Sequence, residues 1–191
     1  MSNIEEEDLV SRRLATRMES LRRQRNLSLD EAAAASGISR ATISRLERGQ
    51  TSPTASQLGR ICTAYQVTMS GLLAEVEANP AQHVPLESQS VWSDPETGFV
   101  RRSVLPPAAG FRSEIIKGEI AGGGVIAYAA APASGFEQYM VIESGALNFS
   151  HAGETFILNQ GDALRFRLTG PTRFENTGNQ PVHYLVILTK A

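Results

Sequence analysis

The periodicity of the sequence changes near residue 79, and this change restricts the fold more than any other feature of the chain. Before it, apolar residues recur at helical spacing, as Leu14, Met18 and Leu21 do in the first segment. From Val91 onward they come in short β-type runs between glycine, proline or asparagine turns. We therefore expect a multi-domain chain, an all-α part followed by an all-β part. The expected divisions are an acidic N-terminal tail (1–8), a helical domain (9–78), a linker (79–90) and a β domain (91–191).

The helical part is expected to hold five helices, because capping residues and glycines punctuate it. Asn26 ends the first helix, and Ser28 is an N-cap for a short second helix that Gly37 ends. Ser39 caps a third helix, which Gly49 ends. After a turn, the segments 55–66 and 69–78 predict two more helices.

The second and third helices carry the spacing of a helix-turn-helix motif. Ala33 lets the two helices approach closely, and Gly37 tolerates the left-handed backbone of the turn. Ile43 and Leu46 form the buried side of the third helix. The outer face then holds Arg40, Ala41, Ser44 and Arg45, where it can enter a major groove.

On these residues, the segment LRRQRNLSLDEAAAASGISRATISRLERGQTSPT resembles the xenobiotic-response-element (XRE) class of helix-turn-helix domains, the type of lambdoid phage repressors and Cro. The resemblance implies a pair between Arg22 and Glu47 that orients the third helix. It implies base contacts from Ser39, Arg40, Ala41, Ser44 and Arg45, and backbone contacts from Ser28, Thr42, Arg48, Gln50 and Thr51. Arginine can bond to guanine and alanine can contact a thymine methyl, although either arginine can instead touch phosphate. The family has glutamine where Leu29 stands, so no phosphate contact is expected there.

The charge distribution agrees with one half of the chain meeting DNA. Residues 9–73 contain ten arginines against four acids, whereas residues 79–191 are slightly acidic. Because one short helix reads few base pairs, we expect a homodimer on an inverted-repeat operator, with half-sites about 10 bp apart or a multiple of that.

The β part resembles a small cupin (jelly-roll) barrel over residues 105–190. ESGAL matches the glycine turn of the first cupin motif, and GETFILNQGD matches the opening of the second, with Asn159 in place of proline. The order of domains resembles regulators that fuse an XRE domain to a cupin sensor.

Many cupins are metal enzymes, but the metal ligands of the family are missing here. Gln138 stands at the glutamate position of the first motif and Thr172 at the histidine position of the second. Of the three histidines, His83 lies in the linker, His151 in a tight turn and His183 in the last strand. We therefore expect no metal, no cofactor and no catalytic activity.

Without a metal, the barrel interior is expected to bind a small organic effector. The residues expected to line this pocket are Tyr128, Gln138, Met140, Arg165, Thr172, Phe174 and His183. Three alternatives stay open: a barrel that only dimerises, a DNA-tethered cupin isomerase or dioxygenase, and an antitoxin-like or scaffold module that binds a partner protein.

Composition sets the compartment. The single cysteine, Cys62, is expected to pack in the core and suits a reducing environment. The N-terminus has no secretory pattern, and no run of eighteen apolar residues occurs. The sequence thus predicts a cytoplasmic, DNA-binding transcription regulator, with a repressor favoured over an activator.

Overall fold

The computed structural model describes residues 3–73, 82–108, 111–131 and 135–190, with side chains described from Arg12 onward. Within these ranges the helices are α1 (Asn3–Gln24), α2 (Leu29–Ser36), α3 (Arg40–Glu47), α4 (Ala55–Tyr65), α5 (Met69–Leu73) and the 3-10 helix η1 (Leu86–Ser88). The strands are β1 (Val91–Ser93), β2 (Val100–Leu105), β3 (Ser113–Ile120), β4 (Val125–Tyr128), β5 (Phe136–Ser144), β6 (Ala146–His151), β7 (Glu154–Asn159), β8 (Ala163–Arg167), β9 (Thr172–Glu175) and β10 (Val182–Lys190). None of the helices in these ranges is long and apolar enough to cross a membrane.

The helices begin at the serines that the sequence indicated. The Ser28 hydroxyl accepts a hydrogen bond from the Glu31 backbone N–H (3.2 Å), and the Glu31 carboxylate accepts one from the Ser28 N–H (2.8 Å). This reciprocal capping box starts α2. Ser39 caps α3 through a single bond of this kind, in which its hydroxyl accepts from the Thr42 N–H at 3.1 Å. Gly37 ends α2 with φ of 65°, a left-handed conformation that glycine adopts without strain.

One boundary differs from the sequence-based expectation. The segment expected to be an acidic tail is helical from Asn3, which is consistent with the favourable position of acidic residues in the first turns of a helix. Helix α5 is described only as far as Leu73, and residues 74–78 of the expected fifth helix lie outside the described residues. The expected linker contains η1, and β1 follows it. At three residues, β1 is too short to show a period, and its pairing with β2 defines it.

The β domain is a sandwich of two antiparallel sheets, as expected for a cupin-like jelly roll. One sheet has the order β1-β2-β3-β10-β5-β8, and the other has the order β4-β9-β6-β7. Between the described strands, no pairing joins the two sheets into one closed barrel. Strand β10 alternates strictly and buries Val182, Tyr184, Val186 and Leu188 between the sheets.

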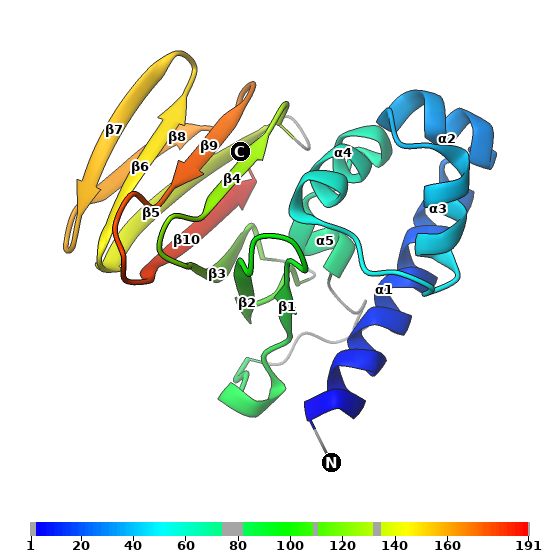
Figure 1. Ribbon diagram of the computed structural model, residues 1–191, viewed down its shortest axis with the longest axis horizontal. Coiled ribbons are helices and arrows are strands. Elements are labelled where there is room, and N and C mark those ends of the chain that lie inside the picture. Colours follow the sequence, from blue (N-terminus) through cyan, green and yellow to red (C-terminus); the bar gives the residue numbers. More distant parts are fainter. Residues whose placement is uncertain (1–2, 74–81, 109–110, 132–134, 191) are drawn as a thin grey trace.

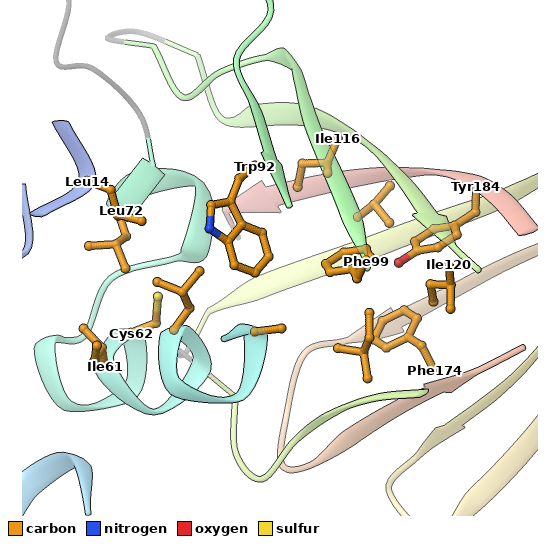
Figure 2. Close-up of a cluster of buried hydrophobic side chains, with 14 of the residues drawn as sticks. Leu14, Ile61, Cys62, Leu72, Trp92, Phe99, Ile116, Ile120, Phe174 and Tyr184 are labelled. Carbon is orange, nitrogen blue, oxygen red and sulfur yellow. The ribbon is translucent and has the colours of Figure 1, made fainter. Parts of the chain in front are cut away.

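The two domains share one hydrophobic core. Figure 1 shows α4 and α5 facing the β domain, with α2 and α3 on the opposite side of the helical domain. In Figure 2, Trp92 of β1 lies between the helical side chains Cys62 and Leu72 and the sandwich residue Phe99. Trp92 and Phe99 meet edge to face at 6.2 Å between ring centroids. The core therefore continues across the domain junction instead of ending at it.

Two further contacts fix the junction. The buried Asp94 carboxylate accepts a hydrogen bond from the Ala55 N–H (2.7 Å), at the first residue of α4, and so caps this helix from the β domain. In the middle of α4, Gly59 packs against the ring of Tyr128, whose Cδ1 lies 2.6 Å from the position that a Cβ would occupy. Only a residue without a side chain allows α4 to come this close to β4.

Candidate DNA-binding surface and effector cavity

The exposed face of α3 carries the residues predicted to read DNA. Its other face is closed, because Ile43 and Leu46 are each only 1% exposed. On the outer side, Thr42 and Ser44 are half-buried, and the remaining predicted contact residues on and around α3 are exposed. These exposed residues are Ser28, Ser39, Arg40, Ala41, Arg45, Arg48, Gln50 and Thr51. The predicted set therefore lies on one accessible side of the helical domain.

The pair that the family resemblance implies, Arg22 with Glu47, is present and holds α3 in place. The Nε and Nη2 of Arg22 donate to the two oxygens of Glu47, both at 2.7 Å, and its Nη1 donates to the Leu27 carbonyl at 2.8 Å. The two side chains are 11% and 7% exposed. Hydrogen bonding to Glu47 raises the pKa of Arg22. One guanidinium thus joins the end of α1, the turn before α2 and the last residue of α3.

Two arginines of the α3 face, Arg40 and Arg48, make contacts within the helical domain. The Nε of Arg40 lies 3.2 Å from the Asp30 carboxylate, and both side chains are mostly exposed. The Nε of Arg48 donates to the Ser44 carbonyl at 3.0 Å. An exposed ion pair of this kind is worth about 0–1 kcal/mol, so Arg40 can exchange Asp30 for a DNA acceptor at little cost.

A cavity of about 110 Å³ lies inside the β sandwich and is closed by α4 and α5. Four of the residues predicted to line an effector pocket do line it: Tyr128, Gln138, Thr172 and Phe174. Gln138 and Thr172, which occupy the metal-ligand positions of the cupin motifs, are only 8% and 7% exposed. The cavity thus presents a neutral amide and a hydroxyl at the two positions where the family resemblance implied metal ligands.

Two of the predicted pocket residues, Arg165 and His183, do not line this cavity, and Met140 is buried without lining it. Arg165 is exposed between the inward residues Leu164 and Phe166. His183 is half-buried and bonds to Ser144 (3.0 Å). Strand alternation explains both errors, since Tyr184 and Phe166 take the inward positions and their neighbours must point outward.

His151 also differs from its expected place in a tight turn. It is the last residue of β6, is 8% exposed, and its two ring nitrogens lie 3.0 and 3.3 Å from the carbonyls of Arg167 and Pro171. It borders a more open groove of about 520 Å³ between the α2–α4 region and the β6–β7 hairpin. The buried ring contacts the segment before β9 through these carbonyls, so His151 has a structural role.

The residues that the sequence analysis missed come from the domain junction. Ser70 of α5 and Arg101 of β2 line the cavity, together with Phe99, Ile116 and Cys62. The sequence carried no signal for Arg101, because the two faces of this strand, Phe99-Arg101-Ser103 and Val100-Arg102-Val104, are similarly apolar. Only the structure shows which face is buried. No sequence pattern indicated that α5 would close the cavity.

The thiol of Cys62 is chemically quiet, as expected for a core residue. It is fully buried, and burial raises the pKa of Cys62 to about 12. Burial also raises the pKa of Tyr128 and Tyr184 well above the usual value. Among the residues that the structure describes, no three His, Cys, Asp or Glu side chains gather as a metal site would require.

Residues 18–72 match the family model HTH_3, described as Helix-turn-helix. The N-terminal domain is therefore an XRE-type helix-turn-helix domain, followed here by a cupin-like β domain, and together they have the organisation of an HTH-type transcriptional regulator.

Three similar proteins share part or all of this organisation. The HTH-type transcriptional regulator SutR of Escherichia coli (strain K12) is 29% identical over 92% of this chain and 93% of its own length. DdrOP3 of Deinococcus deserti, another HTH-type transcriptional regulator, is 38% identical over 34% of this chain and 50% of its own. The crystal structure of an HTH_3 family transcriptional regulator from Vibrio cholerae superposes with a TM-score of 0.77 at 20% identity, covering 97% of this chain and 99% of that one, and shows the same fold. These full-length likenesses are to regulators, not to enzymes.

Proposed function

We propose that this protein is a dimeric transcription repressor that reads an inverted-repeat operator through α3 and releases or tightens its hold when a small organic effector binds. The observation that carries the proposal is the exposed, arginine-bearing face of α3, fixed by the buried Arg22–Glu47 pair. Relatives that are transcriptional regulators support it.

The proposed contacts divide into two kinds. Arg40 and Arg45 read base edges, preferentially guanine, with Ser39, Ala41 and Ser44 beside them. Ser28 at the start of α2 and the residues Thr42, Arg48, Gln50 and Thr51 position the domain on phosphates. A helix of eight residues contacts only a few base pairs, which is why two copies are needed. A dimer seated on an operator also excludes other proteins from the same DNA, which is repression in its simplest form.

The effector part of the proposal rests on the position of the cavity. Its walls come from both domains, since Gly59, Met69 and Ser70 face Tyr128 and Phe174 across it. A ligand in this space contacts α4, α5 and the β domain at once. It changes operator affinity if it binds one arrangement of the two domains better than the other.

The test is operator selection followed by binding measurements on full-length Arg45→Ala and Arg40→Ala proteins. Each loss of a bidentate base contact is expected to reduce discrimination by about 1–3 kcal/mol, or about 5- to 150-fold, at the position it reads. The matched control is Arg23→Ala, which removes the same charge from an exposed site on α1. It should weaken binding only slightly and equally on all sequences. If both α3 variants keep the wild-type preference at moderate salt, the proposed reading helix is wrong.

A further inference from the structure

Arg101 is a buried cation with very little to hold it. It lies on β2 with 5% exposure, facing α5 across the domain junction. Its only hydrogen bond to the described part of the chain is the short one that Nη2 donates to the Ser70 hydroxyl. Within the same described ranges it forms no ion pair. A guanidinium has five N–H donors, so most of the Arg101 N–H groups make no hydrogen bond to the described part of the chain.

The nearest opposite charge does not satisfy Arg101. Glu114 of β3 is also buried, at 5% exposure, yet its Oε2 has no hydrogen-bond partner among the described residues. Burial raises the pKa of Glu114, against the opposing effects of the Ser70 hydroxyl and the Arg101 charge. The carboxyl is therefore neutralised more readily than an ordinary glutamate. A buried guanidinium without a bonded carboxylate is costly, and a fold keeps one where a ligand supplies the anion.

The space in front of Arg101 has the form of a small ligand site. Arg101 and Ser70 line the cavity of about 110 Å³, with Gln138 and Thr172 as further polar groups. The other walls are mostly apolar, apart from the hydroxyls of Thr68, Tyr128 and Tyr184. Figure 2 shows Phe99, Ile116 and Phe174 converging on the sandwich side of the junction. A cavity of about 150 Å³ holds benzene, so this one suits a ligand of about four to six heavy atoms.

We propose that this cavity binds a small organic carboxylate, whose oxygens pair with the Arg101 guanidinium and whose short alkyl part packs against Phe99, Ile116 and Phe174. The planar fork of arginine matches the two oxygens of a carboxylate. This inference rests on the proposed function, because it names the chemical class of the proposed effector.

The same geometry links the ligand to the DNA-binding domain. Ser70 belongs to α5, which packs against α1 and α4, whereas Arg101 belongs to the sheet. A carboxylate on Arg101 competes for the contact that now joins the two. The Arg101–Ser70 bond is therefore the point at which ligand binding changes how firmly the two domains are attached.

The experiment uses the full-length protein and sodium butyrate as the probe. Butyramide, its neutral isostere, and sodium sulfate at equal ionic strength are the comparison compounds. Calorimetry and thermal unfolding should show butyrate binding, no binding of butyramide, and at least tenfold weaker butyrate binding by Arg101→Met. The matched control is Arg102→Met, which removes the neighbouring charge of β2 at a position outside the cavity lining and should bind as wild type does.

Three results would overturn the inference. The first is no binding of acetate, propionate, butyrate or valerate tighter than about 10 mM. The second is equal butyrate binding by Arg101→Met and Arg102→Met. The third is sulfate binding as tightly as butyrate, which identifies an adventitious anion only. Operator binding of both variants without ligand is measured in parallel. If it keeps its sequence preference while no carboxylate binds, the inference fails and the proposed regulator stands.

Discussion

Arg22 and Arg101 are both withdrawn from solvent, one in each domain, but their surroundings are opposite. Arg22 makes three hydrogen bonds, two of them to a carboxylate, and so completes the joint between α1, α2 and α3. Arg101 makes a single bond to a hydroxyl at the joint between α5 and β2. A buried charge that is fully bonded maintains geometry, whereas one left largely unbonded indicates a place where something else binds. We therefore assign a structural role to Arg22, and the proposed ligand-binding role to Arg101.

The most direct test of this comparison is a substitution of Arg22. Arg22→Met leaves Glu47 buried and unpaired, and we expect the free energy of unfolding to fall by about 3–5 kcal/mol, with loss of operator binding. Denaturant unfolding measures the change. The control is Arg23→Met, whose ion pair with Glu19 is largely exposed and should contribute less than about 1 kcal/mol. Similar losses in the two variants would remove the distinction drawn for Arg22.

Asp94 provides a completed contact at the same domain junction as Arg101. Its carboxylate accepts from the N–H groups of Ala55 (2.7 Å), Glu96 (2.8 Å) and Thr97 (3.2 Å). Asp94→Ala should therefore cost about 2 kcal/mol, the upper range for loss of a helix cap. The exposed neighbour in the same turn supplies the control, Glu96→Ala, which should change stability by less than about 0.5 kcal/mol. A negligible effect of Asp94→Ala would mean that the junction is not held by this cap.

Arg101→Met should behave unlike either of these variants. Methionine fills a similar volume and needs no hydrogen bonds, so the lost bond to Ser70 is offset by relief of the buried charge. We expect unfolding free energy within about 1 kcal/mol of the wild type, measured beside Arg102→Met. A loss comparable to that of Arg22→Met would show that Arg101 is structural.

The smallest expected effect is a pH dependence from Glu114. Because burial raises the pKa of this carboxyl, the folded protein keeps its proton at a higher pH than the unfolded chain does. Its contribution to stability is therefore present at low pH and is lost as pH rises through the raised value. Glu114→Gln lacks this loss, so wild-type stability should decline relative to the variant as pH rises above about 4.5, the ordinary pKa of a glutamate. Exposed Glu87→Gln is the control, and parallel pH profiles for wild type and Glu114→Gln would contradict the expectation.

Local patterns in the sequence were sufficient for most of the fold. Capping serines and the glycine turn indicated α2 and α3, and short β-type runs indicated the β domain, because each signal is contained within a few consecutive residues. The three-residue β1 escaped because only its partner β2 defines it. The tail was misassigned because no apolar period marks residues 3–8 as helical.

The two candidate sites also differ in how far the sequence predicted them. The α3 face could be predicted because its residues lie within one segment, with Arg22 and Glu47 implied by the family resemblance. The cavity could be predicted only in part, since its walls come from strands and helices far apart in sequence. Inward positions on β9 were identified correctly, but Arg165 and His183 were assigned for their polarity against the alternation of their own strands.

The close approach of Gly59 to Tyr128 bears on how such a chain can evolve. Glycine inside a helix lowers helix stability by about 1 kcal/mol relative to alanine. Helix α4 accepts this loss at Gly59, where the ring of Tyr128 packs against it. A recombinant that joins a different helix-turn-helix domain to this β domain would need glycine at the position of Gly59, or a smaller residue in place of Tyr128. Domain exchange is thus limited to helical domains that already fit this contact. We therefore expect the helical domain and the β domain to be inherited together.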